Sequence, residues 1–315
     1  MKQPTDLAPS THPKSHKRKL FLWIAIGIVV VLAILYVAVG GIAANTLTVP
    51  QRVFDASQNP GVYNMDYQEF TFPARTDNLT LAAWYIPSET NEKAIVLVHG
   101  RDDSRTKAFG GKFISFAAKL QKAGYSVLMF DLRGHGLSAD SRFSYGLFER
   151  RDVLGAVDWL LAKGFQPGKI GVLGYSLGGA SVIGAAAEEK AIGAIWVDSS
   201  YKDMESMVEL NWVKESGLPK FFWPITKLMI RLLYGYDVTT SKPIEEIASI
   251  APRPIFLAHC QNDELIPNSD MSQLAEVANP VGTWLIPGCS HALGYPLVPD
   301  EYNQKVIHFF DTYIE

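Results

Sequence analysis

One uninterrupted apolar stretch differs from the rest of the chain. Residues 20–50 carry no charged side chain, and the segment LFLWIAIGIVVVLAILYVAVGG within them has no polar stripe. At about 1.5 Å per residue, a helix of this length crosses the roughly 30 Å hydrocarbon core of a membrane. A cleaved signal peptide is the alternative, because GIAAN offers small residues, but its apolar region should be only about 7–15 residues long. The pattern therefore predicts an uncleaved single-pass anchor over 20–43.

Charges on either side of this segment predict its orientation. Four basic residues directly precede it: Lys14, Lys17, Arg18 and Lys19. The first charge after it is Arg52. Because basic flanks stay on the cytoplasmic side of a membrane, residues 1–19 are expected to form a cytoplasmic basic tail. The chain beyond a linker at 44–64 is expected to lie outside the cytoplasm.

Beyond the linker, short apolar runs alternate with amphipathic stretches. The runs expected to form strands are 68–72, 79–86, 94–98, 126–130, 169–174, 194–197, 254–258 and 282–286. Several are continuously apolar, which is typical of strands covered on both faces of a parallel sheet. Helical patterns lie between them at 111–124, 146–164, 177–189, 271–278 and 300–315. The alternation predicts one α/β domain over 65–315, with a mostly parallel eight-stranded sheet and helices on both faces.

One connection is too long for this alternation. More than fifty residues separate the runs at 194–197 and 254–258, whereas such connections usually have about two to six. The insertion, at about 200–250, is rich in Trp, Phe, Leu and Met. It is either a helical pair that merely packs onto the domain or a small cap over a substrate pocket. We favour the cap, with Trp212 and Phe222 as candidates for the pocket lining.

Composition narrows the possible functions. The net charge is −3, so no global basic field indicates a nucleic-acid partner. The two cysteines, Cys260 and Cys289, are too few and too far apart for a zinc motif, and no metal is expected. Two buried free thiols are the favoured interpretation of this pair, and a disulfide in an oxidising compartment is the alternative.

The motif that carries chemistry is GYSLG at 174–178. A bare G-x-S-x-G pattern often occurs by chance. Here it lies between an apolar strand and a helix of small residues, which is the context of a nucleophile elbow. The flanking glycines of such an elbow let strand and helix approach closely at a strained turn. Ser176 is therefore the candidate nucleophile.

A nucleophilic serine needs a histidine to accept its proton and a carboxylate to orient that histidine. Six of the seven histidines fall before the apolar segment or in positions expected to be structural or superficial: His12, His16, His99, His135, His259 and His308. His291, in a loop after the last strand, remains as the base. Asp263, after the strand at 254–258, is the candidate acid, with Asp198 in reserve. Serine, acid and histidine then follow in the order expected after an elbow of this kind.

Stabilisation of a developing oxyanion needs two backbone N–H groups. Leu177, directly after the nucleophile, is expected to supply one of them. Arg101, in the loop after the strand at 94–98, is expected to supply the other.

These motifs together resemble those of the α/β-hydrolase superfamily, over residues 65 to the end. The segments that carry the likeness are VHGRDDSRT, DLRGHGLS, GYSLGG, NDELIP and GCSHALGY. Within the superfamily, the chain looks like bacterial membrane-anchored hydrolases of the serine aminopeptidase and monoacylglycerol-lipase-like branch. The resemblance implies these roles: Ser176 as nucleophile, His291 as general base, Asp263 as its partner, and Arg101 with Leu177 as oxyanion donors. One departure is the pair His259-Cys260, because the family usually has His-Gly before the acid loop.

The predicted function is that of a serine hydrolase that cleaves an ester, or an amide or thioester, through an acyl-enzyme. No cofactor is implied, and the acyl substrate is expected to be a small molecule or lipid-like. A peptidase or lipid thioesterase that uses the same three residues is one alternative. A non-catalytic, hydrolase-like binding protein is another, although such proteins usually lose a member of the triad.

Overall fold

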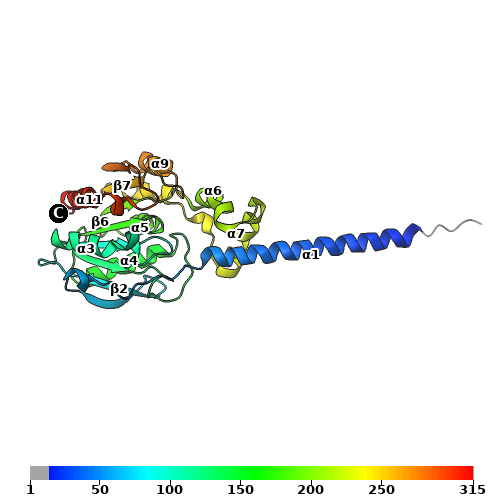
Figure 1. Cartoon of the computed structure of the whole chain (residues 1–315), viewed down its shortest axis with the longest axis horizontal. Coiled ribbons are helices and arrows are strands. Elements are labelled where there is room, and N and C mark those ends of the chain that lie inside the picture. The colour runs from blue at the N-terminus through cyan, green and yellow to red at the C-terminus, as the bar shows by residue number, and fades with distance from the viewer. Residues whose placement is uncertain (1–13, 315) are drawn as a thin grey trace, which may run out of the picture.

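The computed structural model describes residues 14–314 and is built around one eight-stranded sheet. The strand order is β1-β2-β4-β3-β5-β6-β7-β8. Figure 1 shows the whole chain, with β2, β6 and β7 labelled among the strands. The strands are β1 Gln68–Pro73, β2 Thr80–Ile86, β3 Ala94–Val98, β4 Ser126–Phe130, β5 Ile170–Tyr175, β6 Ile192–Asp198, β7 Ile255–Cys260 and β8 Gly282–Ile286. Of these eight, only β2 runs against its neighbours. The predicted mostly parallel sheet is confirmed.

The position of each strand explains its residue pattern. The central strands β3, β4 and β5 are buried along their whole length. The edge strand β8 instead alternates between half-buried and exposed positions before its buried last residue. Continuous apolar runs are therefore found where helices cover both faces of the sheet, as expected for parallel strands.

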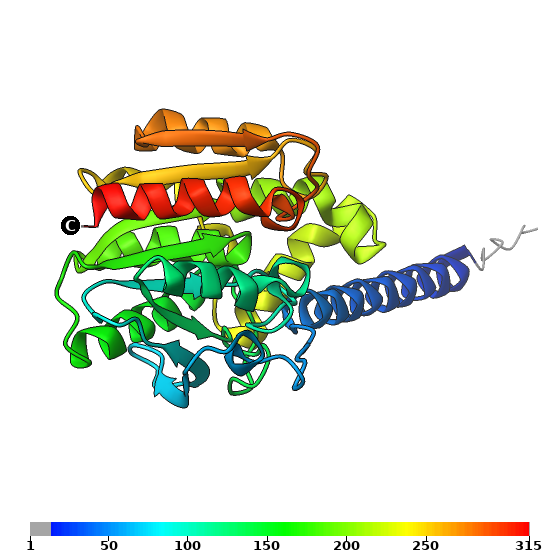
Figure 2. The same ribbon diagram turned by 60° about the vertical axis from the view of Figure 1, so that its left-hand side comes forward.

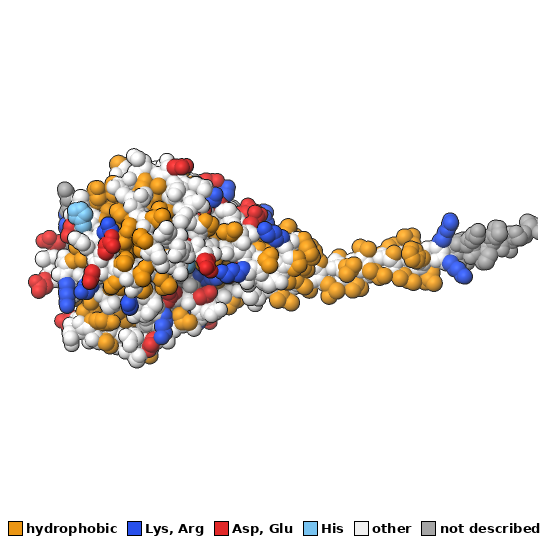
Figure 3. All heavy atoms as spheres, turned by 45° about the horizontal axis from the view of Figure 1, so that its top comes forward, with side chains coloured by type: hydrophobic (Ala, Val, Ile, Leu, Met, Phe, Trp, Pro, Cys, Tyr) orange, Lys and Arg blue, Asp and Glu red, His pale blue; other side chains and the backbone are white. Residues whose placement is uncertain are grey.

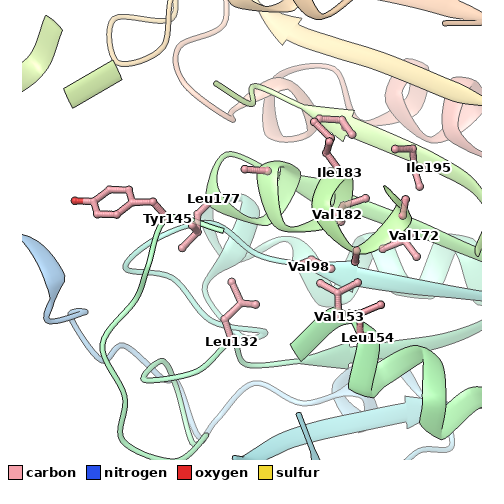
Figure 4. Packing of buried hydrophobic residues seen from close by; sticks show 14 of the residues in the cluster. Val98, Leu132, Tyr145, Val153, Leu154, Val172, Leu177, Val182, Ile183 and Ile195 are labelled. Atoms are coloured by element: carbon pink, nitrogen blue, oxygen red, sulfur yellow. The ribbon is translucent and has the colours of Figure 1, made fainter. Parts of the chain in front are cut away.

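Helices cover the two faces of the sheet in two layers. One layer contains α3 (Phe113–Lys122) and α11 (Pro299–Tyr313), and α11 is the red helix in front of the sheet in Figure 2. The other contains α4 (Glu149–Ala162), α5 (Leu177–Glu188) and α9 (Asn268–Ala278). Figure 4 shows apolar side chains of α4 and α5 packed against those of the strands: Val153, Leu154, Val182 and Ile183 against Val98, Val172 and Ile195. Short helices α2 (Ala108–Gly111), α8 (Pro243–Glu246) and α10 (Gly294–Leu297) lie in connecting segments.

The long insertion between β6 and β7 folds into helices at one end of the sheet. It contains α6 (Met204–Ser216), a 3₁₀ turn (Lys220–Phe222) and α7 (Trp223–Tyr234). Asp203 caps α6 by accepting a 2.8 Å hydrogen bond from the Ser206 amide, and Gly217 ends the helix at φ 69°. Gly235 ends α7 in the same way at φ 77°. A polar side chain that caps the first turn and a glycine with positive φ after the last turn are the expected signals for where a helix begins and ends.

The N-terminal apolar segment forms a helix, α1 (Lys14–Thr48), which projects from the domain in Figure 1. It extends beyond 20–43 at both ends, so the non-helical connection to the domain begins at Val49. By length and composition this helix can either span a membrane or serve as a signal sequence. Residues 1–13 of the expected basic tail lie outside the described part of the chain.

The interpretation of Cys260 and Cys289 as free thiols is wrong, because the two form a disulfide. The strands β7 and β8 are parallel neighbours, and Cys260 pairs with Ile286 in their register. The chain after β8 then folds back, which brings the Cα atoms of the two cysteines to 5.1 Å. The spacing in the sequence does not indicate this return.

Candidate active site

Ser176 occupies a sharp turn between β5 and α5. Its backbone has φ 54° and ψ −123°, a conformation that costs energy for a residue with a side chain. Glycines on both sides make room for the turn. A Cβ at Gly174 would stand 2.5 Å from the carbonyl oxygen of Gly178, and a Cβ at Gly178 would stand 2.5 Å from that of His99. The G-x-S-x-G pattern is therefore required by the close packing of β3, β5 and α5.

The structure brings Ser176, His291 and Asp263 together in one hydrogen-bonded chain. The Ser176 Oγ lies 2.9 Å from His291 Nε2, and His291 Nδ1 lies 2.7 Å from Asp263 Oδ2. A carboxylate can only accept, so the Nδ1–H donates to Asp263 and leaves Nε2 free to accept the serine proton. Each residue follows a different strand of the sheet: β5, β7 and β8.

The Asp263 carboxylate is shielded from solvent and fully engaged. Its Oδ1 accepts hydrogen bonds from the amides of Leu265 (2.9 Å) and Ile266 (2.8 Å). Burial alone would raise its pKa, but the contacts with His259, His291 and the Ile266 amide outweigh burial and hold the pKa of Asp263 well below its usual range. The carboxylate therefore stays ionised, which is the state that orients and stabilises a protonated histidine.

Asp198, the reserve candidate for the acid, has other partners. Its Oδ2 accepts a 2.8 Å hydrogen bond from the Tyr302 hydroxyl, and its Oδ1 accepts one of 2.9 Å from Ser199. Burial raises the pKa of Asp198 despite these bonds. The two carboxylates at neighbouring strand ends thus have opposite pKa shifts, and the one that contacts His291 is Asp263.

Two other buried histidines hold loops near the site. His99 Nε2 accepts from the Leu132 amide at 2.9 Å, and His135 Nε2 accepts from the Asp102 amide at 3.1 Å. Burial lowers the pKa of each to about 4, so both stay neutral at physiological pH. Each ring joins backbone segments through these bonds.

Ser176 and His291 open into a cavity of about 280 Å³ under the insertion. Arg101 and Leu177, the expected oxyanion donors, both line it. Leu177 begins α5, where the first amides of a helix have no partner within the helix. The loop that carries Arg101 is pressed against the elbow, since a Cβ on Gly100 would stand 3.2 Å from the Cβ of Ser176.

Of the two aromatic residues expected in the pocket, only Trp212 lines the cavity. Its indole Nε1 donates to the carbonyl of Pro219 at 3.0 Å, which fixes the ring. Phe222 lies elsewhere: its ring centroid is 5.2 Å from that of Tyr36 in α1. The expectation for Phe222 is wrong because the 3₁₀ turn directs this residue toward the N-terminal helix.

Several residues of the cavity wall carry no sequence signal. They are Leu47 from α1, Tyr145 and Tyr201 from loops, and Met207 and Glu215 from α6. Tyr145 and Leu177 lie at the same end of the core in Figure 4. The Tyr145 hydroxyl donates to the Leu47 carbonyl at 2.9 Å. Leu47 is an apolar residue of the N-terminal helix, and its place in the cavity wall can be recognised only from the three-dimensional packing.

Among residues 14–314, no three His, Cys, Asp or Glu side chains gather closely enough to hold a metal ion.

Comparison with known proteins places this geometry in a family. The model of the alpha/beta hydrolase family matches residues 95–305, about two thirds of the chain. The uncharacterized protein YqkD of Bacillus subtilis is 28% identical over 193 residues, which are 60% of this chain and 63% of YqkD. The match thus spans less than two thirds of that relative. The uncharacterized protein YfhR of Escherichia coli is 24% identical over 81% of this chain and 84% of its own length.

Solved structures show the same architecture. The esterase Pf2001 of Pyrococcus furiosus superposes with a TM-score of 0.68 at 23% identity, covering 85% of this chain and 99% of that protein. An esterase domain from Rhodothermus marinus gives a TM-score of 0.58 at 19% identity, over 79% of this chain and all of that domain. At these identities the likeness concerns the fold. With its elbow, its sheet and the family match, the chain belongs to the alpha/beta hydrolase family.

Proposed function

We propose that the protein is a serine hydrolase that cleaves carboxylic esters through an acyl-enzyme. The observation that carries the proposal is the continuous chain of hydrogen bonds from Ser176 through His291 to Asp263, which ends in a cavity. A nucleophile, a base and an orienting acid in contact meet the geometric requirement for this chemistry.

The proposed reaction has two halves. The Ser176 oxygen attacks the ester carbonyl while its proton passes to His291 Nε2, and the amides of Arg101 and Leu177 stabilise the oxyanion. The C–O bond to the alcohol then breaks, and His291 returns the proton to the departing oxygen. In the second half, His291 takes a proton from water, the hydroxide attacks the acyl carbon, and Ser176 leaves with a proton. The Asp263 carboxylate stabilises the imidazolium in both halves.

An ester is the substrate that this arrangement supports best. Much of the cavity wall is apolar, including Leu47, Met207, Val208 and Trp212, which suits an acyl chain. A thioester is cleaved by the same steps, and a thiohydrolase of Aspergillus aculeatus is 35% identical over 41% of this chain. Thioester cleavage is therefore the second candidate.

We also propose that α1 stays attached and holds the domain to the membrane, with the hydrolase domain outside the cytoplasm. The basic residues before Leu20 support this orientation. The disulfide between Cys260 and Cys289 supports it independently, because disulfides persist in oxidising compartments.

Kinetics of the full-length protein in detergent test the catalytic proposal. The wild type should hydrolyse 4-methylumbelliferyl acetate, and Ser176→Ala should lose nearly all of that activity. Ser249→Ala, at an exposed serine far from the elbow in the sequence, is the matched control and should retain it. An active Ser176→Ala protein, or an inactive wild type, would contradict the proposal.

A further inference from the structure

The N-terminal helix contributes to the wall of the catalytic cavity. Leu47, near its C-terminal end, lines that cavity together with Ser176 and His291. The same Leu47 and Glu215 of α6 also line a second hollow, of about 220 Å³. Two shared residues make the second hollow a neighbour of the catalytic cavity.

The second hollow, which we call the anchor groove, runs along one face of α1. Its α1 residues are Val39, Ile42, Ala43, Thr46 and Leu47, and the rest of its lining comes from the C-terminal end of α6 and from Leu218. Positions spaced by three and four residues share one face of a helix. The groove is therefore a mainly apolar track that leads along the anchor toward the catalytic cavity.

The groove begins where the helix should leave the membrane. Lys19 is the last charged residue before the apolar segment, and Leu20 to Val39 is a stretch of twenty residues. At about 1.5 Å per residue it spans about 30 Å, the thickness of the hydrocarbon core. Val39, at the start of the groove, then lies at the boundary nearest the domain, and Thr46 and Leu47 lie beyond it.

Contacts with the domain hold this end of α1 in place. Gly40 packs so closely on Ile225 of α7 that a Cβ would stand 2.7 Å from its Cγ2 atom. The Tyr36 hydroxyl donates to the carbonyl of Phe221 at 2.6 Å. Arg142 donates to the Asn45 side chain at 2.7 Å. The groove and the catalytic cavity therefore keep a fixed position relative to α1, the helix that we propose spans the membrane.

Apolar side chains of the insertion surround the same end of the helix. Four of them are exposed: Phe221, Leu228, Leu232 and Leu233. They belong to the 3₁₀ turn and to α7, the insertion helix packed against α1. In Figure 3 the apolar surface continues from the projecting helix onto the adjoining end of the domain. Such a surface beside a membrane-spanning helix fits the interface with lipid.

We infer that the substrate is a membrane lipid with a long acyl chain, which enters sideways from the leaflet nearest the domain. Its hydrocarbon chain lies in the anchor groove and its ester group reaches Ser176. Arg101 and Glu215, 2.8 Å apart, form a polar pair at the junction of groove and cavity. This inference rests on the proposed function, and it adds the substrate class and the route of entry.

The test compares two esters with the same leaving group, using the full-length protein in phosphatidylcholine vesicles. 4-Methylumbelliferyl acetate enters from water, and 4-methylumbelliferyl palmitate is placed either in the enzyme's own vesicles or in separate ones. Ile42→Trp and Thr46→Trp fill the groove at exposed positions. Ala38→Trp adds the same ring at an exposed position of α1 outside the groove lining and is the matched control.

In the enzyme's own vesicles, we expect the two groove variants to hydrolyse palmitate at least tenfold more slowly than the wild type. Their rate on acetate should stay within twofold of the wild type. Palmitate in separate vesicles should be hydrolysed far more slowly. Four results would overturn the inference. In the groove variants these are an equal loss on both esters or no loss on either. The others are a loss in Ala38→Trp as large as in the groove variants, and equal palmitate rates from both kinds of vesicle. Wild type that cleaves acetate but not palmitate also overturns it and leaves the proposed function intact. Wild type inert on both esters contradicts the proposed function itself.

Discussion

The strand ends and the insertion–anchor region contribute to the same cavity by different means. At the strand ends, Ser176, Asp263 and His291 are positioned by their places after β5, β7 and β8 and by hydrogen bonds of 2.7–2.9 Å. On the other side of the cavity, α1 and α6 contribute mainly apolar side chains. Directional bonds fix atoms to within the tolerance of a reaction, whereas apolar contacts define a shape that accepts many chains. Under the proposed function, we therefore expect the first region to determine the chemistry and the second to determine the choice of substrate.

The largest expected effect is a difference in kcat between substitutions of the two buried carboxylates at the strand ends. Asp263→Asn should lower kcat by roughly 10³–10⁴-fold, because the amide no longer favours the correct tautomer of His291. Asp198→Asn should cost less than tenfold, since its partners are the hydroxyls of Tyr302 and Ser199. Steady-state hydrolysis of 4-methylumbelliferyl acetate by both variants measures the difference. A larger loss in Asp198→Asn would mean that the acid is misassigned.

The disulfide joins the two loops of the first region that carry Asp263 and His291. It joins Cys260, three residues before Asp263, to Cys289, two residues before His291, and the Asn262 amide donates to the Cys289 carbonyl at 3.0 Å. Closing a loop with a sequence separation of 29 residues contributes about 3.5 kcal/mol to stability in the chain-entropy description.

Removing this bond with the pair Cys260→Ala and Cys289→Ala should lower kcat about 10- to 100-fold and reduce the melting temperature. Treatment of the wild type with a reductant should reproduce the kinetic loss, and the double variant should no longer respond to the reductant. Full activity in the double variant would show that the loops hold their positions without the disulfide.

Within the second region, Trp212 and Phe222 should behave differently. Trp212→Leu enlarges the cavity, so KM for a hexanoate ester should change about five- to tenfold relative to the acetate. Phe222→Leu alters a contact with Tyr36. In detergent it should leave KM for both esters within twofold of the wild type. Equal and uniform losses in the two variants would show that Trp212 only supports the fold.

The smallest effect concerns His259, which contacts the strand-end acid. Burial lowers its pKa, but Asp263, the Ile266 carbonyl and the nearby Asp198 outweigh burial, and the pKa of His259 is raised. A raised pKa means that the stabilisation is fully present below about pH 6.5 and is lost as the pH rises through the higher folded value. The melting temperature of the wild type should therefore fall by a few degrees above pH 6.5.

His259→Gln should flatten this pH dependence, and His308→Gln, at an exposed histidine, should leave it as in the wild type. If the melting temperature changes with pH equally in the wild type and in His259→Gln, His259 does not titrate in this way.

The strand ends and the insertion–anchor region also differ in how much of their structure the sequence predicts. All eight strands lie within two residues of the expected runs, because continuous burial in a parallel sheet leaves a clear apolar pattern. The elbow is equally visible, since its glycines are required by contacts along β3, β5 and α5. By contrast, Leu47, Tyr145 and Glu215 line the cavity without any motif, and Phe222 turns away from it. Their positions depend on how the insertion packs against α1, and residue spacing does not encode that packing.

The most direct test of the account is to locate a covalent adduct. A fluorophosphonate reacts with a serine only when that serine is activated, as Ser176 is proposed to be by His291. Full-length protein labelled in detergent, digested and analysed by mass spectrometry should carry the adduct on the peptide that contains Ser176. The Ser176→Ala protein, with an unchanged melting temperature, should remain unlabelled. An adduct on another residue, or labelling of Ser176→Ala at the wild-type level, would contradict the assignment of Ser176 as the nucleophile.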